Sequence, residues 1–431
     1  MILNFSFKNY LSFRDAQQFS FEPISGKKEF APVLVAAVYG ANASGKSNFI
    51  NALNFVSHFV RTGFAAGDAQ TRIPVVPFLL DSNSIDDDTE FSIDFTSGNE
   101  KYEFSFGLNK NEVTYENLVV YRSKQPSLLY DRTSVNGKQS IKFGSSFTGA
   151  KKQLWDITRK NSLFLSAAAT AGSTVIQPAF KSLAYDVKRY DATLYANELT
   201  EIKKLFIKGD SRARVLSQLI KFADIGIDDI DVRQAESVFG LKEPFVDLKD
   251  IPEEARNIIE EDFKWSFSYD LFFHHKGVGD GLWFNSNQES EGTKAALAFF
   301  FVALNSLSNG SLTLIDELDS SLHPTLLRDF VSLFSDPETN PKGAQLIFST
   351  HDVTLMTRTS PMEEVLERDQ VWFVEKDSEG TSQLIAAMEY SPRANENLGR
   401  NYLNGVYVPL PNPSFHQLMA QLMKEGADIN G

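Results

Sequence analysis

The segment Gly40-Ala-Asn-Ala-Ser-Gly45-Lys46-Ser47 lies between an apolar run, Val33 to Tyr39, and a helix-like run, Ser47 to Val56. It fits the pattern G-x-x-x-x-G-K-[ST], and the apolar run before it is typical of a strand buried in a parallel sheet. The two glycines let successive backbone N–H groups converge on an anion at the helix N-terminus. We therefore predict an α/β fold with a phosphate-binding loop (the P-loop) rather than a turn without a ligand.

A loop of this kind is expected to bind ATP and Mg²⁺ through particular residues. Lys46 is expected to reach the terminal phosphates, and the Ser47 hydroxyl to bind Mg²⁺. The residues of this segment that we expect to contact the nucleotide are Gly40, Asn42, Ser44, Gly45, Lys46, Ser47 and Asn48.

Composition limits the class of protein. The chain has 431 residues, 42% of them hydrophobic, which is enough for two or three domains with a large core. It has no cysteine, which excludes disulfides, thiolate zinc sites and cysteine nucleophiles. The sequence has neither a leader-like start nor a long apolar run, so we expect a cytoplasmic protein and no membrane partner. The net charge of −14 argues against general coating of nucleic acid.

The pattern along the chain predicts three regions. Residues 1–150 hold the P-loop and a series of short alternating runs typical of an antiparallel sheet. Residues 151–262 have mostly helical periodicity and are expected to form an inserted helical region and a surface for a partner. Its basic segment, Glu201 to Lys221, is interpreted as a solvated helix face rather than a nucleic-acid surface. Residues 263–431 hold the second half of the nucleotide site and a tail.

Two carboxylates follow an apolar run in that second half, Leu312-Thr-Leu-Ile-Asp316-Glu317. We expect Asp316 to hold Mg²⁺ and Glu317 to act as the general base on the attacking water. Because adjacent side chains of a strand point in opposite directions, both can serve one site only at the strand end.

A second buried run, Leu346-Ile-Phe-Ser-Thr350-His351, ends in a histidine. A lone histidine is more often structural, but this one follows a strand predicted to lie beside the acidic strand. We therefore expect His351 to contact the γ-phosphate and, with Lys46 and Glu317, to form the catalytic group.

The stretch Glu289-Ser290-Glu291-Gly292-Thr293-Lys294 opens the apolar helix from Ala295 to Leu304. Serine and glycine at a helix start leave free N–H groups at the positive end of the helix dipole, which favours an anion. A simple helix N-cap is the alternative interpretation of the same residues.

Together and in this order, these motifs resemble the ABC-type ATPase heads, in the branch that contains the SMC, RecF and OLD proteins. The resemblance implies that Ser290, Glu291 and Gly292 form the signature motif, that Asp319 is the D-loop aspartate and that His351 is the H-loop residue. It implies a head with a mixed, largely parallel nucleotide-binding sheet, an antiparallel β lobe and a helical insertion. It also implies a homodimer, or a higher oligomer, in which one copy's signature caps the nucleotide on the other.

A narrower resemblance is to the AbiL- and RloA-like ATPases of bacterial abortive-infection and anti-phage systems. The segments that carry it are Phe7 to Phe13, Glu289 to Lys294, Leu366 to Lys376 and Tyr402 to Tyr407. It implies an effector partner, a nuclease or toxin encoded nearby, which the ATPase controls. DNA is an allowed but not a required partner.

Two other functions fit the same motifs. A RecF-like or coiled-coil break-repair-like ATPase would clamp DNA, although no long heptad run is present for coiled-coil arms. A nucleotide-locked scaffold would leave Glu317 largely idle. A membrane-transporter ATPase is the weakest alternative.

Overall fold

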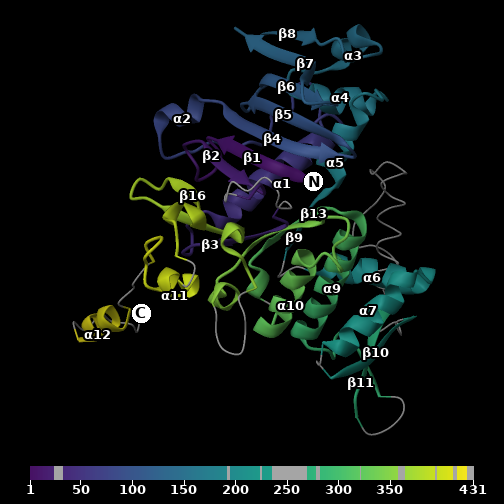
Figure 1. Cartoon of the computed structure of the whole chain (residues 1–431), viewed down its shortest axis with the longest axis vertical. Coiled ribbons are helices and arrows are strands. Elements are labelled where there is room, and N and C mark those ends of the chain that lie inside the picture. Colours follow the sequence, from purple (N-terminus) through teal and green to yellow (C-terminus); the bar gives the residue numbers. More distant parts are fainter. Residues whose placement is uncertain are drawn as a thin grey trace.

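The computed structural model describes residues 1–23, 33–191, 195–223, 226–234, 269–277, 282–320, 322–357, 365–393, 396–410 and 415–424. Figure 1 shows three levels: an antiparallel sheet at the top, a mostly parallel sheet in the middle, and a small sheet with two helices at the bottom. The expected boundary at residues 262/263 lies outside the described residues.

The middle sheet, here called the core sheet, has the strand order β16-β15-β3-β14-β13-β9. All neighbouring pairs are parallel except β15 with β16. The strands are β3 (Val35–Tyr39), β9 (Val187–Asp191), β13 (Leu312–Asp316), β14 (Gln345–Ser349), β15 (Val371–Lys376) and β16 (Ser382–Ala386).

Both faces of the core sheet are buried, which explains why its strands are apolar without alternation. Ala36 and Val38 of β3 belong to one hydrophobic cluster, and Val35 and Ala37 belong to a second. The first cluster includes helix α1 (Lys46–Thr62) and the antiparallel sheet. The second includes helices that cover the opposite face.

The antiparallel sheet confirms the alternating pattern, with strand order β2-β1-β4-β5-β6-β7-β8. Polar and apolar residues alternate because only one face packs on α1 and its neighbours. Its strands are β1 (Ile2–Lys8), β2 (Gln17–Ser20), β4 (Thr89–Ser97), β5 (Glu100–Leu108), β6 (Val113–Tyr121), β7 (Pro126–Val135) and β8 (Lys138–Phe143). Helix α2 (Ser82–Asp86) lies between β3 and β4 in the chain.

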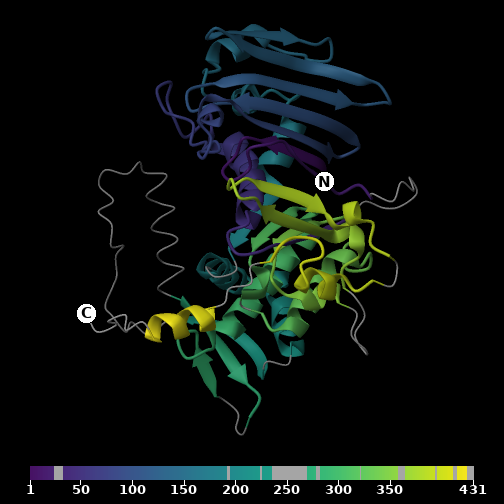
Figure 2. The same cartoon turned by 90° about the vertical axis from the view of Figure 1, so that its left-hand side faces the viewer.

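The lower end holds α6 (Ala196–Lys208), α7 (Ser211–Phe222) and the three-stranded sheet β10-β11-β12 (Figure 2). These strands are β10 (Ile227–Gln234), β11 (Tyr269–His275) and β12 (Trp283–Asn285). Helix α9 (Glu291–Asn309) packs against α6, α7 and α10 (Pro324–Ser335).

Residues 151–262, expected to be helical, also contain strands. The described helices are α3 (Lys151–Ile157), α4 (Phe164–Thr170), α5 (Gln177–Tyr185), α6 and α7. Strand β9 pairs with β13 in the core sheet. The sequence did not predict this strand because a short apolar-polar run is too weak a signal to distinguish from a helix.

The remaining elements are short. They are η2 (Leu318–Ser320), η3 (Val353–Met356), η4 (Arg368–Gln370), η5 (Ala387–Tyr390), α11 (Leu398–Leu403) and α12 (Phe415–Lys424).

Candidate functional site

Three neighbouring parallel strands end at the same edge of the core sheet. The P-loop follows β3, Thr350 and His351 follow β14, and Asp316 and Glu317 lie at the end of β13. Because β3, β14 and β13 are parallel and adjacent, their carboxyl ends bring together residues that are about 300 positions apart in the chain. The structure therefore places these motifs at one edge of the sheet, and that they form one nucleotide site stays a prediction.

The P-loop leaves the start of α1 free for an anion. The N-cap of α1 is Gly45, so no side chain caps the helix, and its first turn has no acidic residue. The first N–H groups of a helix have no acceptor within the helix, and no side chain caps them here. Asn42, Ala43 and Ser47 are exposed at the loop. The donor set therefore fits a phosphate group, with the Ser47 hydroxyl available at the helix start.

Two close approaches explain the P-loop glycines. Gly45 has φ +121°, in the region that favours glycine, and a Cβ there would lie 2.5 Å from Ser382 Oγ. A Cβ on Gly40 would lie 2.3 Å from the carbonyl oxygen of Val374. The loop therefore packs tightly against β15 and β16.

The Lys46 side chain is buried inside the loop. Its ammonium group donates to the carbonyl oxygens of Gly40 at 2.9 Å and Ala41 at 3.0 Å. Burial lowers the pKa of Lys46, and the carboxylates of Asp316, Glu317 and Asp319 partly oppose this effect. The lysine thus lies within electrostatic range of all three acids.

The two acids at the end of β13 are held by one serine. Ser349 Oγ donates to Asp316 Oδ1 at 2.5 Å and accepts from the backbone N–H of Glu317 at 2.8 Å. Glu317 has φ +52°, an uncommon left-handed conformation for a residue other than glycine. This conformation ends the alternation of the strand, so the two adjacent side chains need not point to opposite faces.

His351 and Asp319 lie beside these acids. The backbone N–H of His351 donates to Asp319 Oδ2 at 3.2 Å, and Asp319 Oδ1 is buried without a hydrogen-bond partner. Burial lowers the pKa of His351, and the nearby Lys46 ammonium lowers it further against the opposing effects of Asp319 and Glu317. The neutral imidazole is therefore favoured at pH 7.

The Ser290-Glu291-Gly292 segment forms the start of α9. Ser290 is the N-cap, and its Oγ accepts from the N–H of Thr293 at 3.1 Å. Glu291 is bonded to Tyr195 and, at 2.6 Å, to Lys294. A Cβ on Gly292 would meet only Ser290 Oγ, at 3.9 Å, so packing within the chain does not require a glycine here. Among the described residues, no hydrogen bond or ion pair joins this segment to the P-loop.

The sequence analysis did not identify two serines that support the P-loop: Ser12, between β1 and β2, and Ser382 of β16. Asn48 Nδ2 donates to Ser12 Oγ at 2.8 Å, and Ser382 Oγ lies 2.8 Å from Ser12 Oγ and 2.6 Å from the carbonyl oxygen of Ser44. The backbone N–H of Ser382 also donates to the carbonyl oxygen of Ser12. No single-sequence motif marks these serines, because they meet only in the folded chain.

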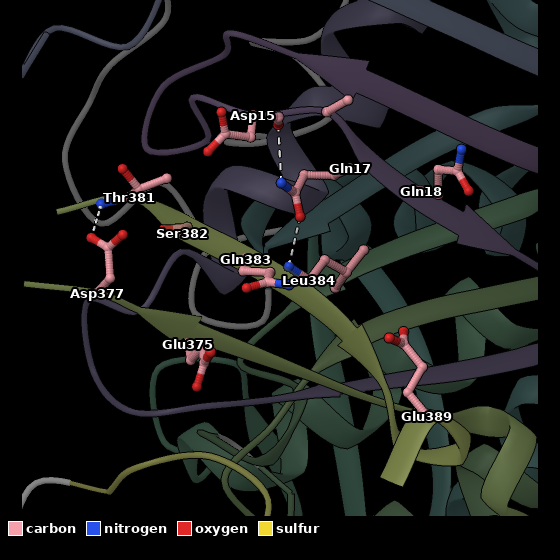
Figure 3. Close-up of a pocket in the computed structure, with 11 residues that line it drawn as sticks. Asp15, Gln17, Gln18, Glu375, Asp377, Thr381, Ser382, Gln383, Leu384 and Glu389 are labelled. Atoms are coloured by element: carbon pink, nitrogen blue, oxygen red, sulfur yellow. Dashed lines mark hydrogen bonds between the residues drawn. The ribbon is translucent and has the colours of Figure 1, made fainter. Parts of the chain in front are cut away.

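A polar pocket of about 400 Å³ extends from Ser382 between β2 and β16 (Figure 3). Gln17 closes one side: its side-chain oxygen accepts from the N–H of Leu384 at 2.8 Å, and its amide donates to the carbonyl oxygen of Asp15. Asp15, Glu375, Asp377 and Glu389 also line it. The pocket thus lies next to the P-loop, between the edge strand β2 of the antiparallel sheet and the edge strand β16 of the core sheet.

In the described ranges, no group of three or more histidines, cysteines or acids has the geometry of a metal site. No helix in the part of the chain that the structure describes is long and apolar enough to cross a membrane.

The fold and the site define a class: a mixed α/β protein with a P-loop between a parallel strand and a helix, and paired acids at the end of another strand of the same sheet. Residues 35–357 match the family model described as "AAA domain, putative AbiEii toxin, Type IV TA system". The match covers more than half of the chain, and the protein belongs to this family of P-loop ATPase domains.

Other comparisons give distant similarity. The SMC head domain from Thermotoga maritima has 15% identity and a TM-score of 0.39, covering 89% of this chain and 98% of that one. The Smc head domain with an extended coiled coil bound to the C-terminal domain of ScpA, from Pyrococcus furiosus, has 13% identity and a TM-score of 0.39. It covers 94% of this chain and 99% of that one. No curated protein matches significantly.

Proposed function

We propose that the protein is an ABC-type ATPase that binds and hydrolyses ATP with Mg²⁺ and controls an effector protein in bacterial anti-phage defence. The observation that carries the ATPase part is the meeting of Lys46, Asp316, Glu317 and His351 at one edge of the core sheet. Membership of a P-loop ATPase family and an uncapped α1 support nucleotide binding at the same edge.

Each residue has a proposed role. The P-loop N–H groups and Lys46 hold the phosphates, while Ser47 and Asp316 hold Mg²⁺, which when bound neutralises charge on the phosphates. Glu317 orients and deprotonates the attacking water. His351, favoured in its neutral form, contacts the γ-phosphate as a hydrogen-bond partner.

We propose that hydrolysis needs two copies, with Ser290, Glu291, Gly292 and Asp319 of one copy completing the nucleotide site of the other. Three observations support this. The signature segment makes its described hydrogen bonds away from the P-loop, Gly292 has free space around it, and Asp319 retains one unpartnered carboxylate oxygen.

The control of an effector is the finer part of the proposal. The family description names a toxin of a type IV toxin–antitoxin system, which supports a place in a toxin-based defence system. The separate effector is implied by the narrower sequence resemblance. The alternative function is a DNA clamp, and the basic segment Glu201 to Lys221 argues against it. The side chains of Lys203 and Lys204 are only 12% and 16% exposed and pair with Asp270 and Glu201, so they are not free to follow a phosphate backbone.

The test of the ATPase uses three variants. Lys46→Ala should abolish ATP binding, Glu317→Gln should bind ATP and accumulate as an assembled species, and Ser290→Arg should bind ATP without hydrolysing it. Mixing Ser290→Arg with Lys46→Ala should restore turnover, because one of the two composite sites is then intact. Failure to restore turnover would contradict the two-copy site, and turnover by Glu317→Gln would remove Glu317 as the base.

The effector is tested separately by co-expressing the chain with the protein encoded beside it and measuring complex mass with and without ATP. A nucleotide-dependent complex with a toxic or nuclease neighbour supports the proposal. A partner-free dimer that binds duplex DNA only with ATP would favour the repair-clamp function instead.

A further inference from the structure

We propose that Tyr195 and His275 are positioning residues for the signature loop, residues 289–292, and thereby connect the lower end of the molecule to hydrolysis. This inference rests on the proposed function, because it assumes that Ser290 and Gly292 serve the nucleotide on a second copy. Among the described residues, no hydrogen bond joins Tyr195 or His275 to the P-loop site of its own chain.

Tyr195 holds the signature loop from the start of α6. It is the N-cap residue of that helix, and its hydroxyl bonds to the Glu291 carboxylate and lies 3.2 Å from the Glu291 carbonyl oxygen. Its ring packs against the cluster that contains the α9 core residues. A shift of α6 along α9 therefore acts directly on the second residue of the signature.

His275 holds the loop from the end of β11. Its Nε2 lies 2.6 Å from Glu289 Oε2, while Glu289 Oε1 accepts from the backbone N–H of Ser290 at 2.8 Å. The Glu289 side chain is only 5% exposed, so it is fixed between these two partners. One carboxylate thus connects the three-stranded sheet to the main chain of the signature serine.

The helix behind the loop is fixed to the same region. Helices α6 and α7 both pack on α9, and Arg212 of α7 donates to Asn305 of α9 at 2.8 Å while pairing with Asp210 at 2.7 Å. Helix α9 and the loop before it therefore have three connections to the lower end: Tyr195 and His275 at the loop, and α6 and α7 along the helix. A displacement of about 1 Å at such a loop is enough to disturb catalysis.

Phosphate recognition at a helix start depends on the orientation of a few backbone N–H groups. Ser290, the N-cap residue of α9, helps to fix that orientation. Its Oγ accepts from the N–H of Thr293. The other N–H groups of the first turn have no acceptor within the helix and can serve an incoming ligand. Loosening Glu289 and Glu291 should leave α9 helical but widen the range of positions that Ser290 and Gly292 adopt.

The test compares Tyr195→Phe with the matched control Tyr185→Phe, an exposed tyrosine at the end of α5. Both changes remove one hydroxyl and keep the ring. Tyr195→Phe should lower kcat for ATP about tenfold, the effect of losing one hydrogen bond to a charged group, with KM changed less than twofold. Tyr185→Phe should match the wild type.

Two further measurements do not depend on turnover. Without nucleotide, amide exchange at residues 290–294 should be faster in Tyr195→Phe, because the N-cap is less constrained. In a Glu317→Gln background, ATP-driven dimerisation measured by mass should be weaker by about tenfold in Kd. His275→Ala should show the same two changes, and His275→Gln, whose amide can still donate to Glu289, should largely reverse them.

Mixing separates this inference from the proposed function. Tyr195→Phe mixed with Lys46→Ala should recover turnover, because the intact P-loop then meets an intact signature. If the Ser290→Arg and Lys46→Ala mixture recovers turnover while Tyr195→Phe behaves like Tyr185→Phe, the positioning role is wrong and the proposed function stands. If the Ser290→Arg mixture stays inactive, the two-copy site itself fails.

Discussion

The change Glu116→Gln tests what holds the antiparallel lobe in place. Glu116 and Arg132 form an ion pair at 3.1 Å in which both side chains are 0% exposed. The carboxylate also accepts from the Tyr130 hydroxyl at 2.8 Å and from the N–H groups of Phe164 and Leu165 at 2.7 and 2.9 Å, at the start of α4. Four donors thus converge on two oxygens.

Glutamine has almost the same shape but only one acceptor oxygen, so its amide NH₂ would face donors. The Arg132 guanidinium would remain buried without a counter-charge, although it keeps carbonyl partners such as Ser162. Breaking a buried pair in this way costs about 3–5 kcal/mol, and we expect the lobe to lose that much stability. The hydrogen bonds lost from the same carboxylate are part of this network, so their free energies are not added to the cost of breaking the ion pair.

Urea titration with pulsed hydrogen exchange of peptides from β6 to β8 measures the stability of this lobe without assuming that the whole chain unfolds in one step. The matched control is Asp156→Asn, an exposed acid on α3, which should change stability by less than about 0.5 kcal/mol. A loss below about 1 kcal/mol in Glu116→Gln would refute the reasoning, since it would mean that the guanidinium finds adequate partners without the carboxylate.

Three further outcomes are expected. Gly45→Ala should weaken fluorescent-nucleotide binding at least tenfold, because its Cβ would meet Ser382 Oγ at 2.5 Å and its φ of +121° disfavours a side chain; unchanged affinity would contradict this. Gly292→Ala should leave the melting temperature and ATP affinity unchanged but reduce kcat; a destabilised variant would show that packing within the chain requires this glycine. The pKa of His351 is lowered in the folded protein, so below the unfolded value of 6.5 the unfolded chain takes up the proton first and the wild type loses stability as pH falls. His351→Gln should show a smaller loss between pH 7 and 5.5 in thermal melts, and identical pH profiles would contradict the assignment.

The prediction of local elements from the sequence succeeded where periodicity was strong. The run Leu312–Asp316 is the strand that the apolar pattern predicted, and the alternating runs of the first 150 residues form the antiparallel sheet. The P-loop lies between the predicted strand and helix, because glycines and a following amphipathic run are sufficient local signals. The order of motifs also predicted correctly that acids and histidine follow strands of one sheet.

Contacts between distant segments could not be predicted in this way. Nothing in the sequence around Ser12, Ser349 or Ser382 distinguishes these serines from others, yet they support the P-loop and the acids at the end of β13. Strand β9 was expected to lie in a helical region, since five residues carry too little periodicity to reveal a strand at a sheet edge. Glu317 likewise adopts a left-handed conformation and donates its N–H to the Ser349 hydroxyl of another strand, a contact that no local pattern indicates.

The sequence by itself determined which chemistry the chain carries: a phosphate-binding loop, two acids, a histidine and a serine-glycine helix start, because glycine conformation, strand alternation and helix capping are properties of short segments. Only the tertiary structure decided which of these residues meet. Parallel pairing of β3, β14 and β13 assembles one half of the proposed site, while α9, with Ser290 at its start, packs against α6 and α7 at the lower end. That division arises because pairing and packing depend on contacts between segments hundreds of residues apart, which no local pattern contains.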